Sequence, residues 1–459
     1  MCGIFGVFGH PDAAALTAQG LQALQHRGHD GAGLISYDGR RFHQQHTLGL
    51  VSEHFSSHSM GKIFPGHTAI GHVRYGTQGD SILANIQPFL VEDLHTGGFA
   101  LAHNGHFSTL TSHRDNSELF GSVPSDTARL VHRIAHIKAP AFLDRFIHGL
   151  MGLNGSYACG VLTPHSFIAA CDPVGIRPLV LGRLGEATIV ASETCALDHV
   201  GAAFLRDLDN GEVIEITCEG LCSFKPFHPA PLRPCIFEYI YLAHPSSRMR
   251  GHLVSDVRQL MGEALGEEAP VYGPAACVIP IPDSGCHAAL GYGRSTGIPY
   301  QEAIKRNPRV GRTFLTSTSV LRHEEAARKY RVNSTMVSGK RVVLVDDSLV
   351  RGTTLGPILN LMREAGSKEI HIRIASPPFR YPDFYGLDLP NGDDLLAAHY
   401  TDAEMQKLMG VDSLAFLSLE GVYRAFGYGQ RNPHTPQLAD HCFTGEYPDT
   451  QIESLKRVA

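Results

Sequence analysis

The chain has 459 residues, 43% of them hydrophobic and 18% charged, which is typical of a globular protein with a large core and two or more domains. The formal net charge of −6 argues against a nucleic-acid-binding surface. No apolar stretch reaches the length of a membrane span, and no basic region followed by a long apolar run opens the chain. We therefore predict no membrane partner and a cytoplasmic protein. The ten cysteines include no CxxC pair and predict free thiols.

Cys2 directly follows the initiator methionine. Removal of Met1 would leave Cys2 with a free α-amine beside its thiol, and an N-terminal nucleophile of this kind carries its own base. Position alone does not distinguish such a nucleophile from a chance cysteine, so the interpretation depends on the motifs that follow. In chain order they are His26–Gly33, Gly71–Thr77, Asn85–Phe89, Leu101–Gly105 and Ser125–Thr127.

The order and spacing of these motifs resemble the class II glutamine amidotransferase family. The resemblance implies that the Cys2 thiolate attacks the side-chain amide of glutamine. It also implies that the Asn104 amide and the Gly105 N–H stabilise the oxyanion of the tetrahedral intermediate.

Three further residues of these motifs would bind the glutamine. The resemblance implies that Arg74 pairs with the α-carboxylate, that Asp126 binds the α-ammonium group, and that Gly28 lets the backbone approach the substrate. Two neighbouring residues depart from the family, which usually has Gln at the position of His29 and often Glu at that of Ala128. Both lie beside the core set, so we expect them to affect the tuning of the glutaminase rather than its chemistry.

Between residues 155 and 220 the sequence has short alternating strands separated by Gly turns. Further matches to the same family here imply an N-terminal-nucleophile fold, a sandwich of two antiparallel sheets covered by helices (αββα). A short segment then holds prolines typical of an extended linker, at Pro226, Pro229, Pro231 and Pro234. We therefore predict a glutamine amidotransferase domain over residues 2–228 and a second domain over residues 229–459.

The second domain begins with Phe237–Ala243, which resembles the start of the synthase domain in the amidophosphoribosyltransferase family. The family continues Arg-Pro-Asp-Ser, whereas here His244 and Ser246 replace the Arg and the Asp. We expect regulatory or interface contacts to differ at this point. The next segment has the spacing of an amphipathic helix, with apolar residues at Leu253, Val257, Leu260, Met261 and Leu265.

The segment Val278–Gly285 ends an apolar strand in a Pro-rich turn. In the family this loop faces the pyrophosphate of phosphoribosyl pyrophosphate (PRPP), and Ser284 matches a position that binds Mg²⁺; a plain turn is the alternative. Residues 305–314 resemble a basic family motif, although Pro308 departs from it. Residues 315–338 are polar and basic and lack a core pattern. They fit a solvated connector or, as we favour, a mobile lid that closes over PRPP.

The strongest motif is Arg341–Thr354. Residues 342–345 are consecutive apolar residues that predict a strand buried on both faces, as in a parallel sheet. Asp346 and Asp347 follow, then a turn of small residues and a helical pattern that stops near Gly366. Such strand ends bind ligands, and the turn suits a phosphate. The carboxylates would repel a phosphate but suit a sugar diol, with or without Mg²⁺. An ordinary Asp-rich helix cap would explain only one of them.

This stretch closely resembles the PRPP motif of type I phosphoribosyltransferases and implies a parallel-sheet α/β domain. The resemblance assigns the ribose to Asp346 and Asp347. It assigns Mg²⁺ to these two residues together with Ser284. It assigns the 5′-phosphate to the turn that follows, with Ser348, Arg351, Gly352, Thr353 and Thr354.

Some members of the family hold a four-iron cluster on four cysteines. Of the matching positions here, Cys235 and Cys442 are cysteines, whereas Asp383 and Ala439 are not. We therefore expect Mg²⁺ as the cofactor and no iron–sulfur cluster.

The resemblance to the amidophosphoribosyltransferase family runs from Cys2 to about residue 445. It implies that the chain makes 5-phosphoribosylamine from PRPP and glutamine, the first committed step of de novo purine biosynthesis, with ammonia channelled from Cys2 to the PRPP site. It also implies a homo-oligomer, dimer or tetramer, with purine nucleotides as feedback inhibitors.

Two alternatives stay open. The departures at His244, Ser246 and Pro308 suggest a divergent paralogue that aminates another phosphosugar. A PRPP-sensing regulator without catalysis would also keep the fold, but it would not need an intact glutaminase set.

Overall fold

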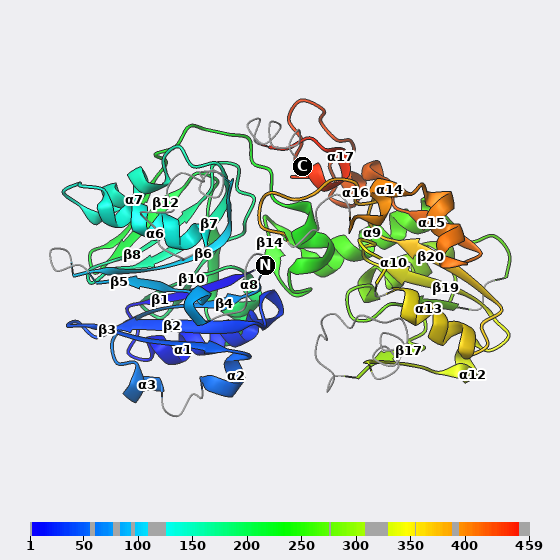
Figure 1. The fold of residues 1–459 in the computed structure, drawn as a ribbon, viewed down its shortest axis with the longest axis horizontal. Helices are drawn as coiled ribbons and strands as arrows, with labels where there is room; N and C mark the ends of the chain where they lie inside the picture. Colours follow the sequence, from blue (N-terminus) through cyan, green and yellow to red (C-terminus); the bar gives the residue numbers. More distant parts are fainter. Residues whose placement is uncertain are drawn as a thin grey trace.

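The structure is a computed structural model that describes residues 2–55, 60–76, 83–92, 97–108, 125–274, 277–307, 329–353, 355–387 and 394–448. Figure 1 shows two lobes, with the sheets of the N-terminal half at the left of the view. The second lobe, at the right, contains β19 (Arg341–Asp346) and β20 (Glu369–Ile374). No helix in this described part is long and apolar enough to cross a membrane.

The first lobe contains two antiparallel sheets. The seven-stranded sheet has the order β11 (Ala203–Asp207), β9 (Val180–Leu184), β10 (Ala187–Ala191), β1 (Gly3–Phe8), β4 (Thr68–Arg74), β2 (Gly31–Tyr37), β3 (Phe42–Leu48). The six-stranded sheet has the order β13 (Gly220–Phe224), β12 (Val213–Thr217), β8 (Phe167–Cys171), β7 (Gly155–Leu162), β6 (Phe99–Phe107), β5 (Phe89–Val91).

Strand β1 shows why these sheets stack, because its residues alternate between two buried faces. Phe5 and Val7 pack into the layer between this sheet and its helices. Ile4 packs into the core between the two sheets. Gly6 points the same way as Ile4, since a Cβ there would lie 2.2 Å from the Phe167 ring of the other sheet. A strand buried on both faces must be central in a layered fold.

Helices cover the outer face of each sheet. α1 (Ala13–Ala23) and α8 (Thr194–Val200) pack on the seven-stranded sheet. α6 (Asp126–His136) and α7 (Phe142–Leu150) pack on the six-stranded sheet. The αββα sandwich expected for this part of the chain is therefore confirmed.

The second lobe is built on a four-stranded sheet with the order β16 (Cys277–Pro280), β19, β20, β21 (Ser413–Phe416), in which all neighbours are parallel. Val343 and Val345 face the core that holds α9 (Val254–Glu268) and α10 (Cys286–Thr296). Val342 and Leu344 face the opposite core, with α13 (Leu355–Glu364) and α15 (Asp402–Met409). The prediction of a parallel-sheet strand buried on both faces is confirmed.

The chain between the lobes has little regular structure. Residues 225–234 contain neither helix nor strand and lie along the first lobe, where Arg233 N–H donates to Val174 O at 2.8 Å. The π-helix η4 (Glu238–Leu242), β14 (Arg248–Met249) and β15 (His252–Leu253) follow. The short helices α16 (Leu419–Ala425) and α17 (His441–Thr444) pack against the same core as η4.

Two expectations need correction. Leu260, assigned to the apolar face of the helix now seen as α9, is 43% exposed, because the helix turns that position away from the sheet. Residues 315–338 were expected to lack core contacts, yet Tyr330 is 5% exposed in β18 (Tyr330–Val332), which pairs with β17 (Ile304–Arg306). The rest of the expected lid, together with Pro308, lies mainly at residues 308–328, outside the described residues.

Candidate active sites

Cys2 lies at the start of β1, next to the end of β4. These strands pair antiparallel with Gly3 opposite Val73, so Cys2 lies beside Arg74. The Cys2 carbonyl oxygen accepts a hydrogen bond from Arg27 Nε at 2.8 Å, and its thiol faces Tyr75 O at 3.9 Å. The backbone of Cys2 is thus held firmly while its side chain stays half-buried.

Arg74 and Gly28 occupy one crowded corner beside Cys2. Arg74 is 6% exposed, and its Nη1 donates to Asn85 O at 2.9 Å. A Cβ on Gly28 would lie 2.5 Å from the Arg74 carbonyl carbon, so only glycine allows this approach. The two residues expected to bind glutamine are therefore neighbours of each other and of Cys2.

Asn104 and Gly105 lie on β6, where they pair with Ala158 and Tyr157 of β7. Asn104 is 1% exposed, and neither its Oδ1 nor its Nδ2 has a hydrogen-bond partner among the described residues. A buried polar group without a partner costs about 1–3 kcal/mol of stability, so such a group in a folded protein suits a ligand. Gly105 has φ of +142°, and a Cβ there would lie 2.0 Å from Ser156 O.

Asp126 opens α6 and reaches back to the same strand. Its Oδ2 accepts a hydrogen bond from Phe107 N–H at 2.9 Å and lies 3.4 Å from His106 Nδ1. Burial favours the neutral acid, but the hydrogen bond from His106 and the nearby histidine charges hold the pKa of Asp126 below its usual range. An ionised carboxylate suits an ammonium ligand.

The departure at Ala128 has a local explanation. Ser125 caps α6, and its hydroxyl accepts from Ala128 N–H at 3.2 Å, so Ala128 occupies the third helical position. An acidic residue at this position could complete a capping box with Ser125. With Ala128 the helix keeps only the hydrogen bond to the Ser125 hydroxyl, and Asp126 stays at the first helical position. His29 is half-buried in the turn that follows Gly28.

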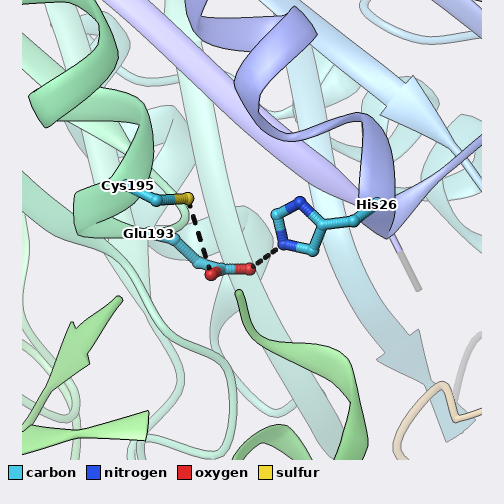
Figure 2. Close-up of side chains that lie close together, drawn as sticks. All are labelled: His26, Glu193 and Cys195. Carbon is cyan, nitrogen blue, oxygen red and sulfur yellow. Dashed lines mark hydrogen bonds and ion pairs between the residues drawn. The ribbon is translucent and has the colours of Figure 1, made fainter. Parts of the chain in front are cut away.

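The sequence did not predict that the buried Glu193 carboxylate binds the arginine that holds the backbone of Cys2. Figure 2 shows the Glu193 carboxylate between the His26 ring and the Cys195 thiol, at 2.8 and 3.8 Å. The same carboxylate accepts a hydrogen bond from Arg27, the residue that holds the Cys2 carbonyl. The Arg27 side chain also bonds Glu238 of η4 at 2.8 and 3.0 Å. Glu238 lies in the Phe237–Ala243 stretch that resembles the family, but no local signal reveals these pairings, because the partners lie far apart along the chain.

Glu193 also reaches the segment that departs from the family. Its Oε2 accepts from His244 N–H at 2.8 Å and from the Ser247 hydroxyl at 2.6 Å. The His244 ring is exposed and meets the Ser246 hydroxyl at 2.7 Å. The two replaced side chains therefore bond each other at the surface, while the buried contacts to Glu193 use the backbone of His244 and the hydroxyl of Ser247.

The second candidate site lies at one edge of the parallel sheet. β16 pairs in parallel with β19, and Pro280 lies opposite Val345. The loop with Ser284 and the Asp346–Asp347 pair therefore leave the sheet at the same edge. Asp346 and Asp347 are 8% and 4% exposed. Burial raises the pKa of Asp346, and the neighbouring charge of Asp347 raises it further.

The turn after the carboxylates leads into α13. The Ser348 hydroxyl donates to Asp347 Oδ2 at 2.6 Å. Gly352 has φ of +70°, which a turn before a helix requires here. Arg351 and Thr353 are exposed, and Arg351 lies 3.9 Å from Asp394. Thr354 lies outside the described residues.

The donor set at this edge fits Mg²⁺. Ser284 is half-buried and lines a small cavity together with Asp347 and Arg258. Carboxylate and hydroxyl oxygens are the ligand type that Mg²⁺ prefers. A buried pair of neighbouring carboxylates is also stabilised by a divalent cation, because their charges repel.

The positions expected not to hold a cluster come together in the structure. Cys235 forms a parallel β-bridge with Ala439. Asp383 Oδ1 accepts a hydrogen bond at 2.7 Å from Nε2 of His441, the residue that precedes Cys442. Ala439 has no ligand atom, and the Asp383 carboxylate is already bonded. Burial raises the pKa of the Cys442 thiol, and the charge of Asp383 raises it further. These residues do not fit a four-cysteine iron–sulfur cluster.

Two domain families match this chain. The glutamine amidotransferase domain matches residues 72–199, which include Arg74, Asn104 and Asp126. The phosphoribosyl transferase domain matches residues 278–375, which include Ser284 and the Asp346–Asp347 pair.

Several named relatives span nearly the whole chain. The amidophosphoribosyltransferase of Rhizobium etli is 49% identical over 98% of this chain and 92% of its own length. The amidophosphoribosyltransferase of Bacillus subtilis is 40% identical over 99% of this chain and 96% of its own. The chloroplastic amidophosphoribosyltransferase of Glycine max is 40% identical over 97% of this chain and 78% of its own.

Solved structures agree over the same span. The glutamine PRPP amidotransferase of B. subtilis, complexed with ADP and GMP, has a TM-score of 0.90 at 39% identity and covers 97% of each chain. A structure described as the allosteric regulatory enzyme of purine biosynthesis has a TM-score of 0.91 at 40% identity, over 97% of this chain and 96% of its own. With relatives of this identity over nearly its full length, the chain belongs to the amidophosphoribosyltransferase family.

Proposed function

We propose that this chain makes 5-phosphoribosylamine from PRPP and glutamine, the first committed step of de novo purine biosynthesis. The observation that carries the proposal is that one chain holds both half-sites. The buried, unpartnered Asn104 amide lies on the strand that also carries Gly105, and the Asp346–Asp347 pair lies at the edge of a parallel sheet. We further propose that the glutaminase half comprises residues 2–228 and the PRPP half residues 229–459.

In the glutaminase half, the Cys2 α-amine takes the thiol proton as the sulfur attacks the amide carbon of glutamine. The Asn104 amide and the Gly105 N–H donate to the oxyanion. Arg74 holds the α-carboxylate and Asp126 the α-ammonium group, while Gly28 leaves room for the substrate. The proton passes to the leaving nitrogen, ammonia departs, and water hydrolyses the thioester to glutamate.

In the PRPP half, Asp346 and Asp347 hold the ribose hydroxyls while positive charge develops at C1. The turn with Ser348, Arg351, Gly352, Thr353 and Thr354 binds the 5′-phosphate and fixes the distance to the reacting carbon. Mg²⁺, held by Ser284 and the two carboxylates, would neutralise the pyrophosphate that leaves. Ammonia forms the new C–N bond as the C–O bond to pyrophosphate breaks.

Ammonia is a nucleophile only while unprotonated, so a closed path between the half-sites protects it from water. We propose such a channel, together with feedback inhibition by purine nucleotides, since the B. subtilis relative was solved with ADP and GMP. We also propose a cytoplasmic homo-oligomer, dimer or tetramer. We propose no iron–sulfur cluster; iron and labile-sulfide assays on anaerobically purified protein test this, and stoichiometric amounts of both would contradict it.

Replacing Cys2 by Ala tests the two-site division. Cys2→Ala should lower glutamine-dependent synthesis by roughly a thousandfold or more, because the nucleophile is lost. Synthesis with added ammonium salts should continue, because the acceptor site is separate. The matched control is Cys218→Ala, which removes an exposed thiol in the turn between β12 and β13. Loss of ammonia-dependent synthesis in the folded variant would refute the division.

A substrate screen separates the alternatives. PRPP-dependent glutamine hydrolysis with formation of phosphoribosylamine supports the proposal. Activity with another phosphosugar only would identify a divergent paralogue, and PRPP binding without turnover would identify a regulator.

A further inference from the structure

A loop of the second lobe meets the strand that carries Asn104 and Gly105. The Tyr385 carbonyl oxygen accepts a hydrogen bond from the Ser156 hydroxyl at 2.6 Å. It also accepts from Arg177, through Nε at 3.1 Å and through Nη2. Ser156 and Arg177 belong to the first lobe and are fully buried. One carbonyl of the second lobe therefore binds two side chains of the first.

The next residue of this loop lies directly on Gly105. Gly386 has φ of +94°, and a Cβ there would be 2.8 Å from both the carbonyl carbon and the carbonyl oxygen of Gly105. On its other side Gly105 lies against Ser156, whose carbonyl oxygen would be 2.0 Å from a Cβ on Gly105. Gly105 is thus confined between β7 and the loop of the second lobe.

Asp383 holds this loop in its conformation. Its Oδ2 accepts from Tyr385 N–H at 2.9 Å and from Leu387 N–H at 2.6 Å. Its Oδ1 accepts from His441 Nε2 at 2.7 Å, and the His441 ring packs edge-on against the Tyr385 ring at 4.9 Å. Both side chains of this hydrogen-bonded pair are at most 1% exposed. Hydrogen bonds to a buried charge are among the stronger ones in proteins.

We propose that Asp383, held by His441, is a positioning residue of the glutaminase half-site, although it belongs to the PRPP half. It fixes Tyr385 and Gly386, which in turn fix Gly105 and the adjacent Asn104 amide. This inference rests on the proposed function of Asn104 and Gly105 as oxyanion donors. Oxyanion stabilisation requires donors at a defined place before the charge develops, so a small shift of this strand lowers the rate.

A metal site is the competing interpretation of these residues, since ligand atoms of Asp383, His441 and Cys442 lie within 4.8 Å of one another. The Asp383–His441 distance of 2.7 Å is a hydrogen-bond distance. Two ligands of a tetrahedral zinc ion would be about 3.3 Å apart. The second carboxylate oxygen of Asp383 already accepts hydrogen bonds from two backbone N–H groups. The geometry therefore favours a hydrogen-bonded pair.

The test compares Asp383→Ala and Asp383→Asn with the parent protein. Asp383→Ala should lower the kcat of glutamine hydrolysis by roughly tenfold to a hundredfold, with little change in the glutamine KM, because Arg74 and Asp126 are untouched. Asp383→Asn should be milder, because the amide oxygen can still accept a backbone N–H. Ammonia-dependent synthesis should stay within about twofold in both variants, since the acceptor site is not altered.

A second readout addresses the oxyanion directly. L-Glutamate γ-semialdehyde forms a tetrahedral adduct with a thiol, whereas glutamate occupies the site without one. Asp383→Ala should weaken the binding of the aldehyde more than that of glutamate, because only the adduct uses the oxyanion donors. The matched control is Tyr423→Phe, which removes a 2.8 Å hydrogen bond to the buried Asp440 of the same C-terminal segment.

Three results would overturn the positioning role. They are unchanged glutamine hydrolysis in Asp383→Ala, an equal loss of aldehyde and glutamate binding, and a fall in ammonia-dependent synthesis as large as that in hydrolysis. Basal glutamine hydrolysis and aldehyde binding are both measured without PRPP, so they decide the role of Asp383 even if the acceptor is not PRPP.

Discussion

At the scale of single residues, Asn104 shows a conflict between stability and function. Its amide is buried, and neither polar atom has a partner in the part of the chain that the structure describes. A folded chain gains nothing from such a group, and a transition state that carries an oxyanion gains a donor.

Asn104→Ala should therefore lower the kcat of glutamine hydrolysis by roughly a hundredfold to a thousandfold. The thermal unfolding temperature should stay the same or rise, because the removed amide makes no hydrogen bond. Calorimetry and glutaminase kinetics on the same preparation check both parts. A clear loss of stability would mean that the amide has a structural partner.

Asp346 shows the same conflict in its ionisation. Its pKa is raised by burial and by Asp347, so the folded protein binds its proton more tightly than the unfolded chain does. Stability contributed by this carboxyl is therefore present at acidic pH and is lost as the pH rises from the ordinary aspartate range to the raised pKa.

Asp346→Asn should remove this loss, so at neutral pH and without Mg²⁺ the variant should unfold at a higher temperature than the parent. Synthesis should fall by roughly a hundredfold with either nitrogen source, because the charge that binds the ribose is missing. Basal glutamine hydrolysis should remain. Unfolding scans at several pH values with a chelator test the first part; wild-type synthesis rates would contradict the second.

At the scale of elements, sheet pairing brings the second half-site together. β17 and β18 form a two-stranded ribbon beside the Ser284 loop, because Arg306 Nη1 of β17 donates to Asp283 Oδ2 at 2.7 Å. Lys329 precedes β18 and Arg331, which is exposed, lies within it. Bound pyrophosphate would add negative charge near these cations, and this attraction would favour a conformation in which the β17–β18 ribbon closes over the PRPP site.

The double variant Lys329→Ala, Arg331→Ala should weaken the stimulation of glutamine hydrolysis by PRPP by about threefold to tenfold. Basal hydrolysis should not change, since the glutaminase half is untouched. The exposed Lys407 of α15 offers a control of similar charge, as Lys407→Ala. The measurement is the hydrolysis rate with and without saturating PRPP, and full stimulation of the double variant would count against this role of β18.

At the scale of the whole molecule, buried charges join the two lobes. Glu238 of η4 accepts hydrogen bonds from Arg27, and also from Arg177 at 3.3 Å. Burial disfavours the charged form of Arg27, but Glu238 and Glu193 hold the pKa of Arg27 above its usual value. Since Arg27 also holds the Cys2 carbonyl, the packing of the lobes and the position of the nucleophile depend on the same residues.

Glu238→Gln should lower the free energy of unfolding by about 3 kcal/mol or more, because it leaves buried arginines with too little negative charge. Denaturant unfolding, followed by circular dichroism, measures this. Glu369→Gln is the control, since Glu369 pairs with Arg341 at a partly exposed site, where solvent screens the ion pair and its loss should change the stability little. Equal effects of both variants would show that the buried network adds little.

Some features could be predicted from the sequence because they depend on neighbours along the chain. The apolar run before Asp346 predicted β19 and its burial, since consecutive apolar residues are typical of a strand that is buried on both faces. Gly366, with φ of +85°, ends the helical pattern as expected. The domain limits and the roles of the site residues stay predictions.

Only the tertiary structure decided which charges share a site. Arg27 and Glu238 are 211 positions apart, Arg27 and Glu193 are 166 apart, and Asp383 and His441 are 58 apart. Periodicity and turn chemistry act over a few residues, so they carry no information on such pairs. Leu260 shows the same limit, because its spacing suits a buried face while the packing of α9 leaves it exposed. The sequence by itself determined the elements and the chemical groups, and the packing of two lobes decided which groups support Cys2 and Gly105, because burial and long-range pairing arise only when distant segments meet.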